Sequence, residues 1–229
     1  MTSLQKWGKS VRTTIPVMAG YLVLGAGFGI LLRTRGYGLG WALAMSAFIY
    51  AGSMQYVAIG LLTGGASLLT TAVTTLLVNA RHLFYGISML ERYRAAGRYA
   101  PYLIFSLTDE TYSLVAARED LTGAECFRIS LLDQLYWVLG TALGSLAGAY
   151  LDFNTTGIDF SLTALFLTVF TEQWLETKDH APALIGLGVS IVCRLLFGAD
   201  SFLLPTMGGM LCCLLVLDAR RTKKGGESV

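Results

Sequence analysis

The stretch GYGLGWALAMSAFIYAGSMQYVAIGLLTGGASLLTTAVTTLLVNA, residues 36–80, runs for 45 residues without an acidic, basic or histidine side chain. A helix needs about 20 mainly apolar residues to cross the hydrocarbon core of a bilayer, so this run has room for two crossings and a short turn. We expect that turn at Thr63-Gly64-Gly65. Further uncharged runs cover 13–32 and 201–217. The sequence therefore predicts an all-α integral membrane protein rather than a soluble domain with buried core helices.

Composition supports this prediction and narrows the function. Charged residues make up 14% of the chain, against about 25% in an average soluble domain. A net charge of +2 is too small to indicate a nucleic-acid partner. The four cysteines have no CxxC or CxxH spacing, and two histidines offer little for a metal centre. The motifs GxSxG, HExxH and the P-loop are absent, so we expect no metal, no cofactor and no soluble-enzyme chemistry.

Eight apolar segments follow one another with short connections. They cover 15–32, 39–62, 66–90, 101–117, 129–151, 160–175, 183–198 and 202–218. We expect six to eight of them to form a bundle of transmembrane or re-entrant helices. This gives a single polytopic transport domain over 1–218 and a basic cytoplasmic tail over 219–229.

The distribution of loop cations leaves two topologies open. If all eight segments cross, ten cations lie on the side of the termini and five on the other, a weak positive-inside bias. If 15–32 and 101–117 instead enter and leave on the same face, all fifteen lie on one side. Both topologies put the two termini in the cytoplasm.

Those two segments have the composition of broken helices. The first carries Gly25, Gly27 and Gly29. Irregular backbone at membrane depth is tolerated only where protein shields it or where it lines a cavity. The ends of half-helices in transporters bind charged substrate groups. The three glycines are therefore candidate substrate-binding positions.

The second segment carries Thr108-Asp109-Glu110-Thr111 at its middle. Adjacent residues on a helix point about 100° apart, so the two carboxylates cannot share one partner. We expect one to face a cavity and the other to pair with a cation or cap a half-helix. Thr108 is a candidate substrate-binding residue, and Asp109 and Glu110 are candidates for proton coupling. A surface loop is the alternative, and 101–117 would then not be a membrane segment.

A third group, Asn79-Ala80-Arg81-His82, ends an otherwise uncharged segment. Asn79 and His82 are three residues apart and share a helix face. Asn79 and Arg81 are candidates for binding a substrate carboxylate, although Arg81 can also reach lipid headgroups. His82 is a candidate proton carrier, with a structural hydrogen bond as the alternative.

A glycine and two uncharged polar residues interrupt segment 39–62. Gly52, Ser53 and Gln55 would let a substrate approach the backbone, or they serve close helix packing. Asp133 and Gln134 lie near the start of 129–151, beside Tyr136 and Trp137, and are interpreted as part of an interfacial belt.

Taken in order, these motifs resemble the AzlC family, the large subunit of branched-chain amino-acid exporters. The resemblance covers about residues 10–175. The matching stretches are Ile15-Pro16 to Gly20-Tyr21, Gly25-x-Gly27-Phe28-Gly29, Ala51-Gly52-Ser53-Met54-Gln55, Asn79-Ala80-Arg81-His82-Leu83-Phe84-Tyr85-Gly86, Thr108-Asp109-Glu110-Thr111, Trp137-x-x-Gly140-Thr141-x-x-Gly144 and Gly157-Ile158-Asp159-Phe160. It implies export of leucine, isoleucine and valine, with methionine as a further candidate. It also implies a bacterial or archaeal plasma membrane and a small membrane subunit of the AzlD type.

The sequence thus favours a secondary transporter driven by protons. Two other classes stay open. In a channel the acidic pair would form a selectivity ring, and in a membrane enzyme acting on a lipid-linked substrate Asp109, Glu110 and His82 would be the acid–base groups. Segments 183–198 and 202–218 are short for a crossing. Their polar backbone is expected to need cover from a small hydrophobic partner chain or from a second copy of this chain.

Overall fold

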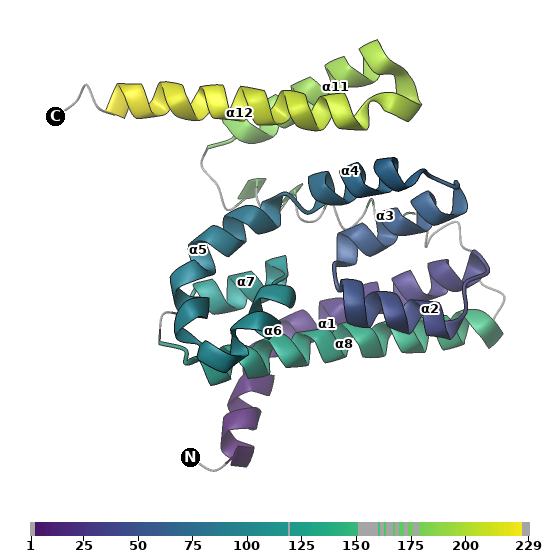
Figure 1. Ribbon diagram of the computed structural model, residues 1–229, viewed down its shortest axis with the longest axis vertical. Helices are drawn as coiled ribbons and strands as arrows, with labels where there is room; N and C mark the ends of the chain where they lie inside the picture. The colour runs from purple at the N-terminus through teal and green to yellow at the C-terminus, as the bar shows by residue number, and fades with distance from the viewer. Residues whose placement is uncertain are drawn as a thin grey trace. The chain divides into compact units, whose positions relative to one another are not determined.

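The computed structural model describes residues 3–118, 120–150, 160, 163, 167, 170–171, 174–175 and 179–225. Over these residues the chain is helical, with no β-strand (Figure 1). It divides into two compact units, Met1–Leu162 and Thr163–Val229. The all-α prediction is confirmed. The number of membrane crossings, the single transport domain and the cytoplasmic tail stay predictions.

Two long helices are the scaffold of the first unit. Helix α1 covers Ser3–Thr34 and helix α8 covers Gly123–Tyr150. They lie side by side in Figure 1, and α1 bends in its N-terminal part. Pro16 gives the reason for the bend, because proline has no backbone N–H and its ring crowds the preceding turn. Leu4–Thr34 of α1 is long and apolar enough to cross a membrane.

Glycines bring the backbones of α1 and α8 together. A Cβ on Gly25 would lie 2.8 Å from the carbonyl oxygen of Trp137, and one on Gly140 would lie 2.7 Å from that of Leu22. Gly29 meets the backbone of α8 one turn further on. The helix break predicted for this segment is therefore wrong. Its spaced glycines serve close helix packing instead, and α1 is continuous through them.

The segment predicted at 39–62 is broken. Helix α2 covers Leu39–Ala44, a π-helical turn η1 covers Met45–Ile49, and helix α3 covers Gly52–Thr63. Tyr50, between η1 and α3, has a φ of 43°. This left-handed conformation costs a non-glycine residue roughly 1–2 kcal/mol. After α3 the chain turns at Gly65, with a φ of 62°, which confirms the predicted turn.

Two further helix pairs are interrupted in the same way. Helices α4 (Leu68–Val78) and α5 (Arg81–Ala95) are separated by a turn at residues 79–80. The 3₁₀ turn η2 (Gly97–Tyr99) leads into α6 (Ala100–Phe105), and α7 (Asp109–Ala116) follows after residues 106–108. Thr108 caps α7, since its side chain accepts a hydrogen bond from the backbone N–H of Thr111. The predicted break inside 101–117 is confirmed.

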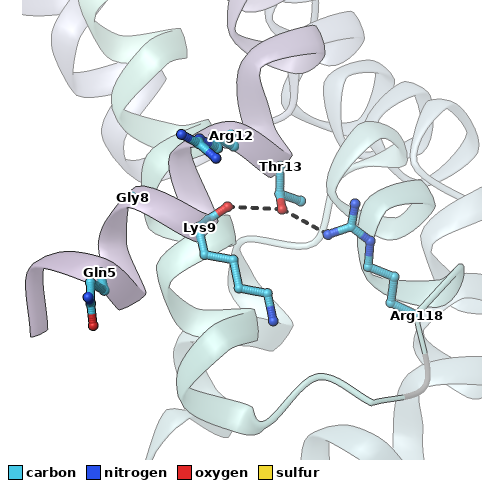
Figure 2. A pocket seen from close by; sticks show the side chains of 6 residues that line it. All are labelled: Gln5, Gly8, Lys9, Arg12, Thr13 and Arg118. Atoms are coloured by element: carbon cyan, nitrogen blue, oxygen red, sulfur yellow. Dashed lines mark hydrogen bonds between the residues drawn. The ribbon is translucent and has the colours of Figure 1, made fainter. Parts of the chain in front are cut away.

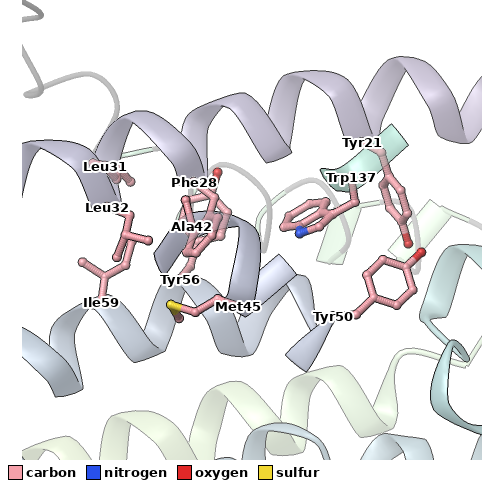
Figure 3. Packing of buried hydrophobic residues seen from close by; sticks show 10 residues of the cluster. All are labelled: Tyr21, Phe28, Leu31, Leu32, Ala42, Met45, Tyr50, Tyr56, Ile59 and Trp137. Carbon is pink, nitrogen blue, oxygen red and sulfur yellow. The ribbon is translucent and has the colours of Figure 1, made fainter. Parts of the chain in front are cut away.

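Aromatic side chains fill the space between the scaffold and the first broken helix. Figure 3 shows this cluster, with Trp137 of α8 between residues of α1 and α3. Trp137 meets Tyr21 edge to face, at 5.4 Å between ring centroids. A second cluster packs α5, α6, α7 and α8 together around Leu103 and Val115, both 0% exposed. The two clusters hold the ends of the broken helices in place.

The second unit contains α11 (Ala181–Ser201) and α12 (Leu203–Gly225). Gly198 has a φ of 74° and kinks α11. A Cβ on Gly209 of α12 would lie 3.0 Å from a methyl group of Val189 on α11, so this glycine serves packing within the chain. Ala181–Gly198 is long and apolar enough to cross a membrane. The predicted segment 160–175 and the motif at 157–160 lie largely outside the described residues.

Candidate functional site

Arg81 joins the starts of three broken helices. It is the first residue of α5, and its Nη1 lies 2.5 Å from Oδ2 of Asp109, the first residue of α7. Its Nη2 donates a hydrogen bond of 2.8 Å to the hydroxyl of Ser53, in the first turn of α3. The structure therefore brings together predicted site residues from three separate stretches of sequence. The expectation that one carboxylate of the acidic pair would meet a cation is confirmed for Asp109.

Several polar atoms at this junction are left open. The Nε of Arg81, Oδ1 of Asp109 and Oδ1 of Asn79 are buried and have no hydrogen-bond partner. Yet the side chains of Arg81 and Asp109 are 35% and 30% exposed, so the junction can be reached from outside. Buried polar groups without partners are uncommon, and a bound ligand or a water molecule would satisfy them. The open donor of Arg81 and the open acceptor of Asp109, two paired side chains, suit a ligand that carries both signs of charge.

A mainly apolar cavity of about 490 Å³ lies between α5 and α6, and it is reached from this junction at Asn79 and His82, which flank Arg81 in the sequence. Its polar lining residues are Asn79, His82, Tyr93 and Arg94, and much of the rest is aliphatic, including Leu83, Ile87, Ile104 and Leu107. His82 is held by contacts of its Nδ1 with the backbone oxygen of Asn79, at 3.2 Å, and of its ring edge with Tyr85. Its predicted proton-coupling role is untested, and its contacts here are structural.

A buried chain of hydroxyl groups connects Glu110 to Asp133. The hydroxyl of Tyr21 donates to Oε2 of Glu110 at 2.7 Å and lies 2.7 Å from Oγ1 of Thr108. Thr108 donates to Thr111 at 3.1 Å, and Thr111 donates to Oδ2 of Asp133 at 2.8 Å. Thr108, a predicted substrate-binding residue, thus serves in this network as well as in capping α7.

Asp133 is the site residue that sequence reasoning undervalued. It was interpreted as interfacial, but it is 0% exposed, and its Oδ1 has no hydrogen-bond partner. No described cation forms an ion pair with it. The sequence did hold a signal, because Asp133 is the only charged residue between positions 129 and 151. A lone carboxyl in an apolar membrane segment marks a functional site by default.

A second buried network holds Gln55. Its Nε2 donates to the hydroxyl of Ser46 at 3.1 Å, and its Oε1 accepts from Nε1 of Trp137 at 3.0 Å. Ser46 in turn lies 2.9 Å from Oγ1 of Thr141. A Cβ on Gly52 would lie 3.1 Å from the Trp137 ring. Gly52 and Gln55, which were predicted to bind substrate, therefore make contacts within the protein. Of the predicted group, only Ser53 contacts Arg81.

The three glycines of α1 divide between two faces. Gly25 and Gly29 are buried against α8, and Gly27 is half-buried. Positions two apart on a helix point in nearly opposite directions. Their predicted role in substrate binding is untested, and the contacts of Gly25 and Gly29 are those of a helix interface.

A separate basic pocket of about 580 Å³ lies at the N-terminal end of α1 (Figure 2). Lys9, Arg12 and Arg118 line it, and Nη1 of Arg118 donates to Oγ1 of Thr13 at 2.8 Å. Lys9 lies 3.5 Å from Glu125, beside the pocket. Hydrogen bonds from the backbone N–H and the side chain of Thr122, with Lys9 as a weaker influence, lower the pKa of Glu125.

The helical fold and the long uncharged runs define the class of this chain, a helical membrane protein. Comparison with known families is more specific, because the family model described as AzlC protein matches residues 16–151. The chain belongs to the AzlC family.

Several relatives match most of the chain. The chain is 46% identical to the "Branched-chain amino acid transport protein AzlC" of Bacillus subtilis, over 89% of this chain and 82% of that protein. It is 42% identical to an "Uncharacterized membrane protein" of Haemophilus influenzae, over 92% of this chain and 87% of that protein. It is 26% identical to the "Inner membrane protein YgaZ" of Escherichia coli, over 90% of this chain and 87% of that protein. No solved structure matches the chain.

Proposed function

We propose that this chain is a secondary transporter that exports leucine, isoleucine and valine, with methionine as a further substrate, driven by protons. The name of the Bacillus subtilis relative supports branched-chain amino acids as the substrate class. Export, rather than uptake, comes from the resemblance to the family. The membrane is the plasma membrane of a bacterium or archaeon, with both termini in the cytoplasm.

The observation that carries the proposal is the Arg81–Asp109 pair beside the aliphatic cavity. A free amino acid presents a carboxylate and an ammonium on one carbon, so its site needs a cation and an anion close together. Arg81 and Asp109, 2.5 Å apart, provide both. The planar guanidinium fits a carboxylate with two parallel hydrogen bonds. The open Oδ1 of Asp109 and Oδ1 of Asn79 are acceptors for the ammonium group.

The cavity explains the choice of side chain. Burying a methylene group contributes about 0.8 kcal/mol, so an aliphatic cavity prefers branched-chain amino acids to glycine or serine. Its volume of about 490 Å³ falls in the range of roughly 300–1,000 Å³ found for small-molecule sites. When no substrate is bound, Arg81 and Asp109 neutralise one another. Substrate entry separates them. The substrate carboxylate then replaces Asp109 as the partner of Arg81, and the substrate ammonium replaces Arg81 as the partner of Asp109.

Proton coupling is assigned to the acidic residues of the first turn of α7. Asp109 forms an ion pair with Arg81 in the proposed substrate site, and Glu110 accepts a hydrogen bond from Tyr21. Protonation of either residue would change the charge beside the substrate. His82, on the cavity wall, is the third candidate.

Transport from liposomes tests this function directly. Vesicles containing the purified protein are loaded with labelled leucine, and efflux is followed with and without a pH gradient. We expect saturable efflux that responds to the gradient. Arg81→Lys keeps the charge but loses the two-pronged geometry. The loss of charged hydrogen bonds worth about 1.5–3 kcal/mol raises the KM for leucine about 10- to 100-fold. Asp109→Asn has an effect of similar size.

The matched control is Glu91→Gln, which removes an exposed carboxylate from the same helix as Arg81 and leaves transport unchanged. Efflux that never saturates and never accumulates leucine against its gradient would identify a channel instead. Efflux of leucine that ignores the pH gradient would remove the proton from the proposal.

We also propose that a small AzlD-type membrane subunit completes the transporter. A second chain can cover the apolar side chains at the edge of the cavity, because Leu83, Ile87 and Ile104 are 70%, 72% and 65% exposed. A homo-oligomer is the competing arrangement. The chain is produced alone and together with a small AzlD-type membrane protein, and the two preparations are compared. Full export activity from the chain alone would contradict an obligate partner.

A further inference from the structure

The buried network between Glu110 and Asp133 is one hydrogen atom short. It contains four contacts: Glu110–Tyr21, Tyr21–Thr108, Thr108–Thr111 and Thr111–Asp133. Each hydrogen bond needs one hydrogen, and each hydroxyl side chain brings one. Three hydroxyls therefore serve three of the four contacts when both carboxyls are ionised. The Tyr21–Thr108 contact of 2.7 Å is then left without a hydrogen, because Tyr21 donates to Glu110 and Thr108 donates to Thr111.

A single added proton completes the network. If it resides on Glu110, the carboxylic acid donates to Tyr21, and Tyr21 is free to donate to Thr108. The remaining hydroxyls then donate in order toward the Asp133 carboxylate. If it resides on Asp133, every hydroxyl turns around and the donation runs toward Glu110. One concerted shift of the hydrogens converts the first state into the second, and no proton crosses open space.

Burial and charge require the same proton. Asp133 is 0% exposed and no described cation pairs with it, so a carboxylate there is poorly compensated. Two carboxylates joined by so short a chain repel one another, and sharing one proton removes half of their charge. The other titratable groups that face Asp133 are the phenols of Tyr50 and Tyr102. The hydroxyl of Tyr50 has no hydrogen-bond partner and points toward that of Tyr21 (Figure 3).

We propose that Glu110 and Asp133 share one proton through the hydroxyls of Tyr21, Thr108 and Thr111, and that this relay couples proton movement to transport. The inference rests on the proposed transport function for its role, but not for the shared proton itself. Glu110 is the outer end, because it is half-buried and adjoins Asp109 of the substrate site. Asp133 is the inner end. A proton that enters at Glu110 is balanced by one that leaves from Asp133 when the helices rearrange.

Two transport measurements separate coupling from substrate binding. Net leucine efflux driven by a pH gradient needs proton movement, whereas exchange of internal for external leucine at equal pH does not. In Asp133→Asn we expect efflux to lose its response to the gradient while exchange persists. Thr111→Val, which interrupts the relay, gives the same loss. Thr14→Val is the matched control, since Thr14 is equally buried on α1 but bonds to Tyr136 outside the relay.

The shared proton has a signature that does not depend on transport. Infrared spectroscopy separates the C=O band of a protonated carboxyl from the bands of a carboxylate. The wild-type protein at neutral pH should show a buried carboxylic acid band that is lost in both Glu110→Gln and Asp133→Asn.

Each outcome decides one claim. Wild-type vesicles without leucine exchange would refute the proposed function, while the infrared band still decides whether the proton is shared. An absent band would overturn the shared proton. Normal gradient-driven efflux in Asp133→Asn would overturn the coupling role. If both Asp133→Asn and the conservative Asp133→Glu lose exchange as well as efflux, Asp133 is structural and the relay proposal fails.

Discussion

Two glycines of helix α1 should respond oppositely to the same substitution. A Cβ at Gly29 would lie 2.6 Å from the backbone nitrogen of Ser145 and closer still to the carbonyl oxygen of Thr141. Ordinary contact begins at 3.4 Å, so α1 and α8 must separate by at least about 0.8 Å, the difference between that distance and 2.6 Å. A gap of about 0.5–1 Å forfeits a quarter to a half of the dispersion attraction across an interface. Overpacking typically costs about 1–3 kcal/mol, and backbone obstacles favour the upper part of that range.

We therefore expect Gly29→Ala to destabilise the protein by about 2–3 kcal/mol. Gly20→Ala, on the same helix, meets nothing within 4 Å. It should stabilise the protein by about 0.5–1 kcal/mol, because alanine loses less chain entropy than glycine in a helix. At about 2–4 °C per kcal/mol, the apparent Tm should fall by about 4–12 °C in the first variant and rise slightly in the second. Thermal unfolding in detergent at one scan rate measures both. Equal shifts of the two variants would refute the close packing of α1 and α8.

Three further substitutions probe single contacts of the first unit. Glu125→Gln should lower stability at pH 7 by about 0.3–1 kcal/mol, because a negative charge in the first turn of α8 is lost. The pKa of Glu125 is lowered from its ordinary value of 4.5, so its contribution is present above that pH and disappears as the pH falls through the folded-state pKa. Thermal midpoints of variant and wild type should thus converge in acid, and a constant gap would contradict the assignment. Gln55→Leu leaves the buried N–H of Trp137 without an acceptor and should cost about 1–3 kcal/mol, visible as a lower Tm and altered tryptophan fluorescence. Arg92→Met removes hydrogen bonds to two backbone carbonyls at and just beyond the end of α7, and should cost about 1.5–3 kcal/mol. Unchanged Tm values in these two variants would show that the contacts do not stabilise the fold.

The fold was predictable where the physical cause is local. The long uncharged run predicted apolar helices, and Gly64-Gly65 marked the turn between α3 and α4. The break before Asp109 was predictable because two adjacent carboxylates do not fit an apolar helix. The break at Tyr50 was not predicted, since no proline or charge marks it. The break after Val78 was not predicted either, although Arg81 and His82 follow it directly. The break at Tyr50 lies where α2, η1 and α3 pack against α1 and α8, and α8 is distant in sequence.

The glycines of α1 show the same limit. Glycines at spacings of two and four residues fit either an unwound helix or a close helix contact. The choice depends on Gly140 and Gly144 of α8, more than a hundred residues away in the sequence. No local pattern in 15–32 contains that information.

The candidate site was predicted in its parts rather than in its arrangement. Ser53, Arg81 and Asp109 were identified from polar residues in apolar surroundings, and the structure joins them. Asp133 was undervalued because the neighbouring Tyr136 and Trp137 resemble an interfacial belt. Its importance follows from total burial and from Thr111, neither of which is visible in the sequence alone.

The glycine contact between α1 and α8 divides the first unit into a rigid and a movable part. Backbones that touch without intervening side chains cannot slide past one another without collision, so the two helices move as one rigid body. The continuous helical hydrogen-bond ladder is interrupted at 50–51, 79–80 and 106–108, so a rotation there breaks fewer backbone hydrogen bonds than one inside a helix. Any opening and closing of this unit is thus confined to rotations of the short helices at these three interruptions, while α1 and α8 stay fixed. Arg81 at the start of α5 holds the starts of α7 and α3 together through its contacts with Asp109 and Ser53.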